Sequence, residues 1–286
     1  MAGTLPFRRV AVIGTGLVGG SFALALRRQF PEISIIGYDR IPEEAAARGA
    51  VHEITRDLAA AIRGADLVYI ALPIGATIEA LPRVAEFSEP HALVTDACST
   101  KWVVCRAAAE KFHNRARFLG GHPMAGKEHS GVEHADADLF RDAPYVLIGS
   151  QDSVDPRVKE FVKTLSAIGA QPLWCDADTH DWAAGIVSHL PQLAAIALAR
   201  VVQDETDETG MPLTLAGHGL QDTLRLAGSP YSVWRDILLT NRENISRALD
   251  RLAQAIDHLR RNLASREMEH EFEIANELYS VLRKPQ

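Results

Sequence analysis

Short apolar runs rich in β-branched residues alternate with stretches of helical periodicity from the start of the chain to Cys175. This alternation is typical of βαβ units and a mostly parallel sheet. Helices are expected between the strands, including residues 57–63, closed by Gly64, and a segment that starts at Pro42 and is closed by Gly49. We expect one sheet with strands at residues 10–13, 33–38, 66–72, 93–96, 118–119, 145–148 and 172–175.

The strand-like runs end near Asp178, and the rest of the chain has a helical pattern. Helices are expected at residues 181–203, 213–226, 233–262 and 266–282, with Gly-x-Pro breakers at 210–212 and 228–230. The predicted fold class is therefore α/β, a mostly parallel N-terminal sheet followed by an all-α C-terminal domain. We place the domains at residues 1–176 and 177–286. The apolar helices predict a homodimer, and the cleft between domains is the expected substrate site.

The first apolar run opens onto Gly14, Gly16 and Gly19, in the spacing Gly-x-Gly-x-x-Gly. This spacing allows a sharp turn, a close approach of backbone to a pyrophosphate, and tight packing of a helix on a strand. The second run ends at Asp39, about 20 residues further on, where an acid can bind a ribose hydroxyl. The order indicates a dinucleotide site; a flavin or methyl-donor nucleotide, or a turn that binds nothing, is the alternative.

The nucleotide is predicted to contact the fingerprint turn, the acid that follows the second strand and the loop after the strand at 66–72. Asp39 favours NAD over NADP because a carboxylate repels a 2′-phosphate, although Arg40 next to it has the opposite effect. The predicted cofactor-binding residues are Gly14, Thr15, Gly16, Leu17, Val18, Gly19, Asp39, Arg40, Leu72 and Pro73.

The composition is ordinary for a globular enzyme, with 47% hydrophobic and 23% charged residues. A net charge of -7 and the lack of a basic run argue against nucleic acid or an anionic membrane as partner. We expect no signal peptide and no apolar stretch of the roughly 18 residues that a membrane span requires. Three cysteines without a C-x-x-C motif fit reduced thiols, so the predicted location is the cytoplasm.

Two polar positions lie where strands of the sheet are expected to end. Pro123 biases His122 towards extended backbone, and the small neighbours of His122 are expected to leave the imidazole uncovered, as proton transfer requires. A histidine that merely ends a strand is the alternative. Ser99 is expected to open a helix, where it would cap the first turn and still face the cofactor side.

The helical half contains two further candidates. His189 lies two residues before Pro191 in an apolar helix, and either packs in the core or lines a polar pocket. Arg225 follows Asp222 by three residues, so it either forms an ion pair on the helix or binds a carboxylate in its fork. No metal site is predicted: the spacing of His122, His129 and His134 is broken by glycines. Cys98 and Cys105 are expected to be packing residues.

Five segments together resemble the prephenate/arogenate (cyclohexadienyl) dehydrogenase family of tyrosine biosynthesis, over nearly the whole chain. They are residues 14–21, Thr-Asp-Ala-Cys-Ser-Thr-Lys at 95–101, Gly-Gly-His-Pro-Met-Ala-Gly at 120–126, Ser-His-Leu-Pro-Gln at 188–192 and Leu-Arg-Leu-Ala-Gly-Ser-Pro-x-x-x-Trp-Arg-Asp at 224–236. The resemblance implies a Rossmann domain, a helical dimerisation domain, and NAD-dependent oxidative decarboxylation of prephenate to 4-hydroxyphenylpyruvate, or of arogenate to tyrosine.

By the same resemblance, His122 would bind the ring hydroxyl and become positively charged, and Ser99 would orient His122 beside the nicotinamide. Arg225 would bind a substrate carboxylate, while His189 and Trp234 would line the pocket, with Trp234 supplied by the partner subunit as one option. Lys127 departs from the small hydroxylated residue expected after the His-Pro-Met-Ala-Gly segment. Near the pocket, Lys127 favours the keto acid prephenate.

Two other classes of protein compete with this interpretation. Dehydrogenases of β-hydroxyacids or imines use a lysine in the helical domain, and here no lysine occurs between Thr164 and Lys284. A non-catalytic NAD sensor that dimerises through its helices would bind the cofactor but turn over neither substrate.

Overall fold

The structure, a computed structural model, describes residues 7–41, 49–113, 115–127, 129–152 and 155–283. The helix predicted to start at Pro42 lies outside these residues.

A six-stranded sheet forms the centre of the N-terminal half, in the order β3-β2-β1-β4-β5-β6. Every neighbouring pair in this sheet is parallel. This is the Rossmann strand order, and it reverses direction between β1 and β4, where such folds bind nucleotides. The strands are β1 (Arg9–Ile13), β2 (Ser34–Tyr38), β3 (Glu53–Thr55), β4 (Leu67–Ile70), β5 (Leu93–Asp96) and β6 (Arg117–Leu119).

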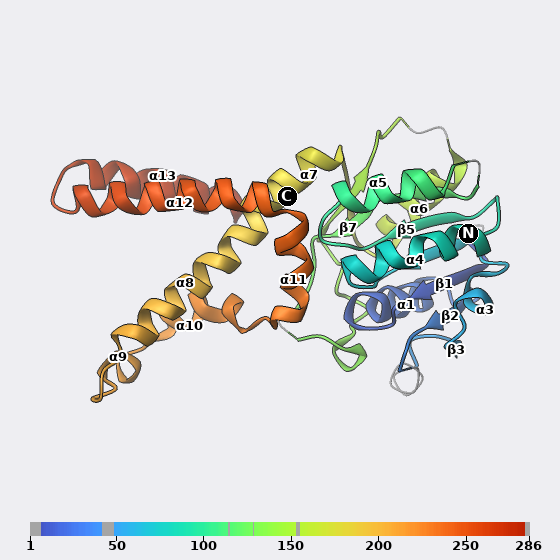
Figure 1. Cartoon of the computed structure of the whole chain (residues 1–286), viewed down its shortest axis with the longest axis horizontal. Helices are drawn as coiled ribbons and strands as arrows, with labels where there is room; N and C mark the ends of the chain where they lie inside the picture. Colours follow the sequence, from blue (N-terminus) through green and yellow to red (C-terminus); the bar gives the residue numbers. More distant parts are fainter. Residues whose placement is uncertain (1–6, 42–48, 114, 128, 153–154, 284–286) are drawn as a thin grey trace.

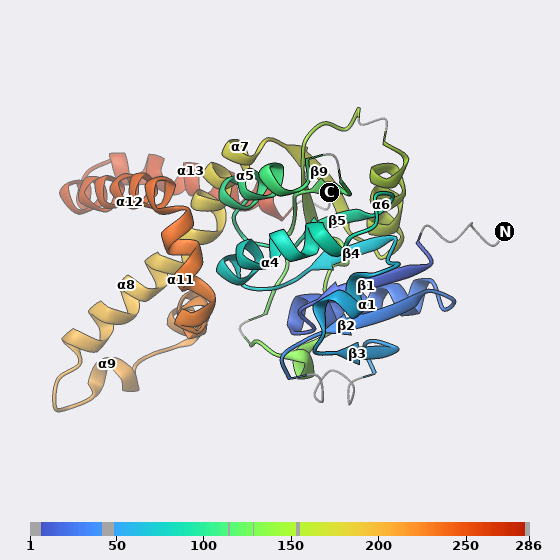
Figure 2. The same cartoon turned by 45° about the vertical axis from the view of Figure 1, so that its right-hand side comes forward.

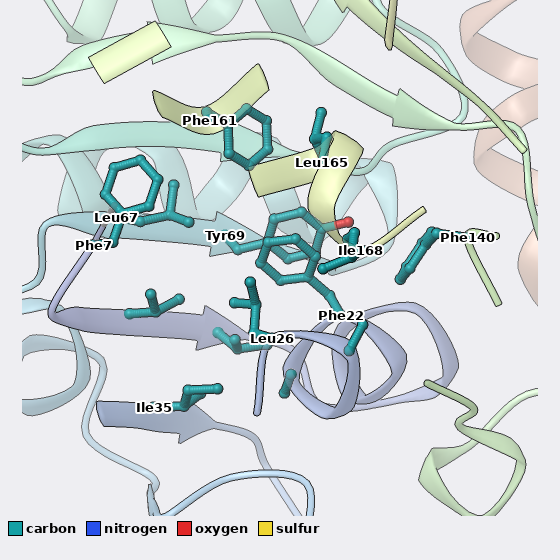
Figure 3. Close-up of a cluster of buried hydrophobic side chains, with 14 of the residues drawn as sticks. Phe7, Phe22, Leu26, Ile35, Leu67, Tyr69, Phe140, Phe161, Leu165 and Ile168 are labelled. Carbon is teal, nitrogen blue, oxygen red and sulfur yellow. The ribbon is translucent and has the colours of Figure 1, made fainter. Parts of the chain in front are cut away.

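Helices cover both faces of this sheet, and residues of alternating position along each strand pack against them (Figures 1 and 2). One face packs on α1 and α6, where Phe22 stacks on Tyr69 at 3.8 Å between ring centroids (Figure 3). The other face packs on α3, α4 and α5. The predicted α/β class is thus confirmed. The helices are α1 (Leu17–Gln29), α3 (Leu58–Ile62), α4 (Ile74–Phe87), α5 (Trp102–Lys111) and α6 (Pro156–Ala167).

The strands predicted at residues 145–148 and 172–175 do not complete the main sheet, and this expectation was wrong. They belong to a second, three-stranded sheet made of β7 (Gly121–Pro123), β8 (Pro144–Ile148) and β9 (Gln171–Cys175). Only Gly120 separates β6 from β7, and β8 pairs with β7 rather than with β6. The chain therefore leaves the main sheet at Gly120 and starts a new one, with β8 antiparallel to β7 and parallel to β9.

From Ala177 onwards the described elements are helical, and two of the predicted helices are divided. The predicted helix at 181–203 is interrupted by a π-helical turn, η2 (Gly185–His189). The predicted helix at 233–262 breaks at Asn241, whose side chain turns inward to bond Asp181 and His189. The helices are α7 (Ala177–Ala184), α8 (Leu190–Glu205), α9 (Met211–Thr214), α10 (His218–Leu224), the 3₁₀ turn η3 (Arg225–Gly228), α11 (Tyr231–Thr240), α12 (Arg242–Asn262) and α13 (Glu267–Leu282).

The helical half projects from the sheet, with α12 and α13 side by side and α8 diverging from them (Figures 1 and 2). Many of its apolar side chains are exposed, among them Val201, Leu239, Phe272 and Leu278. Within the described residues, the helical run Ala177–Glu205 is long and apolar enough to cross a membrane by length and composition. The expectation that no stretch reaches that length was therefore wrong. The same test is passed by helices of soluble proteins, so it is weak evidence for a span.

Candidate active site

The glycine-rich turn between β1 and α1 is held by contacts within the protein at two of its three glycines. Gly14 has φ +92°, and a Cβ on it would lie 2.5 Å from the carbonyl oxygen of Ala71. A Cβ on Gly19 would lie 1.9 Å from the carbonyl oxygen of Gly14. At Gly16, by contrast, a Cβ would meet no protein atom within 4 Å. The open space at Gly16 faces the N-terminus of α1, where a pyrophosphate fits.

Asp39, at the end of β2, is tied to the same turn. One of its carboxylate oxygens accepts hydrogen bonds from the backbone N–H and the hydroxyl of Thr15, at 2.8 and 2.9 Å. The other accepts a bond from the backbone of Ile41 at 3.2 Å. Arg40 is exposed beside it. Asp39 therefore holds the turn and places a negative charge at its rim.

A cavity of about 470 Å³ opens against this turn and extends to the helical half. It is lined by five of the predicted cofactor residues: Gly16, Leu17, Val18, Leu72 and Pro73. The other five predicted residues, Gly14, Thr15, Gly19, Asp39 and Arg40, lie outside its lining. The donor-rich turn and the mostly apolar wall fit a dinucleotide.

A second cavity, of about 400 Å³, adjoins the first. The two share Ser99, Ala125, Gly126, Lys127, Ser229, Val233 and Ile237 in their linings. The structure brings all six predicted catalytic and substrate residues to the second cavity: His122, Ser99, Arg225, His189, Trp234 and Lys127. They come from both halves of one chain, so the Trp234 of this cavity is the chain's own and not the partner's.

His122 lies on β7, and two glycines set its position. A Cβ on Gly121 would lie 2.7 Å from the backbone oxygen of Asp96, and one on Gly120 would lie 2.5 Å from the sulfur of Cys105. Only glycines allow β7 to pass this close to the end of β5. His122 is 8% exposed, so the expectation of an uncovered imidazole was wrong. The covering residues come from the helical half, which local sequence could not indicate.

The hydrogen-bond partner of His122 is His180 of α7, with 2.9 Å between Nδ1 of His122 and Nε2 of His180. His180 in turn bonds Asp181 through its Nδ1 at 2.7 Å. Burial lowers the pKa of His122 well below its usual value, and the nearby His180, Lys101 and His189 lower it further. His122 is therefore neutral at pH 7 and can accept a proton.

Ser99 does not open the helix that follows it, contrary to expectation. Helix α5 begins at Trp102, and its first turn is capped from the other half of the molecule. The carboxylate of Asp181 accepts hydrogen bonds from the backbone N–H groups of Lys101 and Trp102, at 2.7 and 3.0 Å. Ser99 instead lies where the two cavities meet.

A buried ion pair lies beside β7. Lys101 and Asp96 are both fully buried and bonded to each other. Lys101 also donates to the carbonyl of Gly121 at 2.7 Å, and Asp96 accepts from the N–H of Gly121 at 3.1 Å. These bonds satisfy the charges and fix the backbone next to His122.

His189 is 1% exposed and forms one wall of the second cavity. Its Nδ1 lies 3.1 Å from the side-chain nitrogen of Asn241, and its ring meets that of Trp234 edge to face at 5.8 Å. The amide oxygen of Asn241 accepts a bond from Asn244, so the Asn241 nitrogen donates to His189. Burial lowers the pKa of His189 to about 4. A neutral His189 that accepts at Nδ1 carries its proton on Nε2 and is a donor there.

Two predicted cations lie at the rim of the second cavity. Arg225 begins the η3 turn and is exposed, and Lys127 forms an ion pair with Asp136 at 3.1 Å. Sequence reasoning missed Gln192, which lines the same cavity, is 2% exposed, and has a side-chain nitrogen with no partner among the described residues. A polar ligand oxygen would satisfy it.

The two cysteines near the site are packing residues, as expected. Cys98 is 3% exposed, and burial raises the pKa of its thiol far above the usual value. Burial also raises the pKa of Cys105 to about 12. Neither sulfur is a thiolate at neutral pH, so neither is an activated nucleophile.

A fingerprint turn at the switch point of a Rossmann sheet, with one cavity for a nucleotide and an adjoining one lined by a proton-accepting histidine, defines a two-domain nucleotide-dependent dehydrogenase. The family model described as "Prephenate dehydrogenase, nucleotide-binding domain" matches residues 22–173. The one described as "Prephenate dehydrogenase, dimerization domain" matches residues 176–278. The chain belongs to the prephenate dehydrogenase family and is an oxidoreductase.

Individual relatives agree with this assignment. The chain is 33% identical to a prephenate dehydrogenase of Lactococcus lactis subsp. cremoris over 93% of its own length and 75% of the relative's. The crystal structure of prephenate dehydrogenase from A. aeolicus in complex with hydroxyphenyl propionate and NAD+ is similar at a TM-score of 0.84 and 28% identity, covering 99% of both chains. Synechocystis arogenate dehydrogenase is similar at a TM-score of 0.78 and 27% identity, covering 96% of this chain and 99% of its own. Membership of this enzyme family argues against the non-catalytic sensor.

The different surroundings of Gly16 and Gly19 predict different effects of a single methyl group. We expect Gly19→Ala to lower the free energy of unfolding by about 1–3 kcal/mol, because its Cβ collides with backbone. Gly16→Ala should change stability by less than about 1 kcal/mol but weaken dinucleotide binding about tenfold or more, because the methyl group occupies the approach to the pyrophosphate. Urea denaturation without cofactor and calorimetric titration with NAD+ measure the two effects. Unchanged NAD+ affinity in Gly16→Ala would place the pyrophosphate elsewhere.

Proposed function

We propose that this chain is an NAD-dependent prephenate dehydrogenase that converts prephenate to 4-hydroxyphenylpyruvate. The observation that carries the proposal is a neutral, buried His122 in a cavity that adjoins the nucleotide cavity through Ser99. The names of the relatives support the substrate, and the A. aeolicus complex with NAD+ supports the cofactor.

The reaction needs a proton acceptor beside the ring hydroxyl of the substrate. A hydride leaves the carbon that bears the hydroxyl, the O–H bond breaks, and the bond to the ring carboxylate breaks to release carbon dioxide. The electrons of that bond complete the aromatic ring, and the phenol oxygen regains a proton. The bound nicotinamide supplies the hydride acceptor. The protein must hold one proton during this sequence and return it.

His122 is the residue proposed to hold this proton. Its lowered pKa leaves it unprotonated and able to accept the hydroxyl proton at neutral pH. The same low pKa favours return of the proton to the phenolate that forms. Ser99, between the two cavities, is proposed to contact the same hydroxyl region beside the nicotinamide.

The other polar side chains of the second cavity are proposed to bind the two carboxylates and the keto group. Arg225 offers a planar fork for a carboxylate. His189 and Gln192 offer buried N–H donors, and Trp234 packs against His189 as an apolar wall. Lys127, at the rim, favours the keto acid over the amino acid arogenate. Arogenate is the second substrate to test, because the similar Synechocystis structure is an arogenate dehydrogenase.

We also propose that the enzyme is a cytoplasmic homodimer, with domains divided at residues 176 and 177. The exposed apolar side chains of α8, α12 and α13 need cover, and the matching family model for this half is described as a dimerization domain. A second copy of the chain supplies that cover. Size-exclusion chromatography with light scattering tests the dimer.

Parallel assays with prephenate and arogenate, each with NAD+ and NADP+, test the proposed function. We expect reduced nicotinamide and carbon dioxide to form in equal amounts, fastest with prephenate and NAD+. Failure with both substrates would refute the proposal.

Replacement of the proposed base should remove most of the turnover. We expect His122→Asn to lower kcat by roughly 10²–10⁴-fold, the usual contribution of a general base, with little change in NAD+ affinity. In the wild type, kcat should fall with acid only as the pH drops well below 6.5, because burial lowers the pKa at which His122 becomes protonated. Stopped-flow absorbance at a series of pH values measures kcat of the variant and the pH dependence of kcat in the wild type. An unchanged kcat would exclude His122 from the chemistry.

Arg225 should act on substrate binding. We expect Arg225→Ala to raise KM for prephenate about tenfold to hundredfold, the range for loss of a charge-assisted hydrogen bond, with a smaller effect on kcat. Arg225→Lys, which keeps the charge without the fork, should recover only part of this loss. If Arg225→Ala changes stability but not KM, the arginine has only a structural role.

The charge of Asp39 should set the choice of cofactor. We expect Asp39→Asn to lower the ratio of kcat/KM for NAD+ over NADP+ about tenfold or more, because repulsion of the 2′-phosphate is lost. The asparagine oxygen can still accept the bonds from Thr15, so the turn should keep its shape. A wild-type preference for NADP+ would instead show that Arg40 dominates the rim.

A further inference from the structure

Three buried side chains form a continuous line of hydrogen bonds that ends at the second cavity. Asp181 bonds Nδ1 of His180 at 2.7 Å, and Nε2 of His180 bonds Nδ1 of His122 at 2.9 Å. Asp181 and His180 are each 3% exposed and His122 is 8% exposed. The first two lie on α7 in the helical half, and His122 lies on β7 in the nucleotide-binding half, so the line crosses the junction between them.

The order of donors and acceptors along this line determines where the protons lie. A carboxylate only accepts, so Nδ1 of His180 donates to Asp181. With a single N–H on the His180 ring, already donated to Asp181, Nε2 of His180 accepts. The bond to His122 is then donated by Nδ1 of His122, which leaves the lone pair of the neutral His122 ring on Nε2. His122 lines the second cavity, and its basic nitrogen is then the one that is not bonded to His180.

Asp181 is held firmly enough to impose this order. Its two carboxylate oxygens accept bonds from the backbone of Lys101 and Trp102, at the N-terminus of α5, where the helix dipole favours a negative charge. Its backbone oxygen accepts a bond from the side chain of Asn241 at 2.7 Å. The carboxylate cannot turn away from His180 without breaking the cap of α5.

The other charged and titratable groups around His122 are bonded to partners other than His122. Lys101, from the loop before α5, is paired with Asp96 from β5. His189, from η2, bonds Asn241. Asp181 is therefore the anion linked to His122 through an imidazole, and it is placed to stabilise positive charge that arises on His122.

We propose that His180 and Asp181 are positioning residues, which fix the tautomer of His122 so that Nε2 is free to accept the substrate proton. The proposal rests on the proposed function of His122 as the base. No proton leaves the line: the substrate O–H bond breaks, the proton bonds Nε2 of His122, and Nδ1 keeps its proton throughout. The positive charge that results is shared through the bond to His180.

Replacement of His180 tests the proposal. His180→Phe fills a similar volume without an acceptor, whereas His180→Gln keeps an oxygen near the position of Nε2. We expect His180→Phe to lower kcat for prephenate about tenfold to hundredfold, with KM and NAD+ affinity within about twofold of wild type. His180→Gln should restore much of the loss. A rise in KM together with the fall in kcat, without rescue by glutamine, would overturn the proposal.

Nuclear magnetic resonance of ¹⁵N-histidine-labelled protein gives a readout that does not depend on activity. The His122 signals, assigned by their loss in His122→Asn, should show a proton on Nδ1 and none on Nε2 at neutral pH in wild type. His180→Phe should move the proton to Nε2. A wild-type His122 protonated on Nε2 would refute the proposal even if the variants do not fold. If wild type has the expected tautomer but does not oxidise prephenate, the proposed function fails and the positioning contact stands.

A matched control separates positioning from loosening of the helix that carries His180. Asp176→Ala removes the side-chain cap of α7, where Asp176 accepts bonds from the backbone and hydroxyl of Thr179 at 2.8 and 2.6 Å. This variant should have a lower melting temperature but an unchanged His122 tautomer and kcat. If Asp176→Ala lowers kcat as much as His180→Phe, the effect of His180 is structural.

Discussion

The carboxylate of Asp181 is the contact on which the geometry of the whole molecule depends. It caps α5 in the nucleotide-binding half, while the residue itself sits on α7 in the helical half. Asn241, at the junction between α11 and α12, donates a hydrogen bond to the backbone oxygen of Asp181. The same side chain bonds His189, so the network reaches the wall of the second cavity. A buried carboxylate is costly unless its lone pairs are used, and here they are used by groups from both halves. This carboxylate therefore joins the two halves at the site between them, together with the bond from the backbone of Gly75 to Asp236 and the bond between Thr100 and Thr240.

The nucleotide site follows a different logic, because its parts are local in the sequence. The fingerprint turn is shaped by its own backbone collisions at Gly14 and Gly19, which require glycine whether or not a ligand is bound. Gly16 meets no protein atom within 4 Å of a Cβ, and it lies at the N-terminus of α1, where a pyrophosphate fits. These surroundings agree with the roles that the spacing predicts for the three glycines.

Sequence reasoning predicted the Rossmann sheet and the helical half because both rest on periodicity and short-range motifs. It also brought together His122, Ser99, Arg225, His189 and Trp234, since the family resemblance carried them. It failed where contacts between residues far apart in the sequence determine which strands pair and where helices break. The second sheet arises because β8 pairs with β7 rather than with β6, and the helix breaks at Asn241, whose buried amide bonds Asp181 and His189.

Some functional residues were missed for the same reason, because their roles depend on contacts between residues far apart in the sequence. His180 and Asp181 look like ordinary polar positions in the first turns of a helix, and only the docking of the two halves puts them behind His122. Lys101 belongs to the motif at 95–101, but local sequence does not indicate its burial beside Asp96, which fixes the backbone next to the imidazole. The residues directly before them in α7, Asp178 and Thr179, are polar as well, so the His180-Asp181 pair gave no distinct local signal.

The location of His122 on one half and of its hydrogen-bond partner on the other has a consequence for how such a protein can be rebuilt. A chimera that joins the nucleotide-binding half of this chain to the helical half of a relative keeps the cofactor site intact, since that site is made mostly within one half. Its imidazole, however, is oriented only if the donor half brings an equivalent of His180 in the same register. Recombination at the boundary near Ala177 must therefore preserve the contact between these two rings as well as the cap that Asp181 forms on α5.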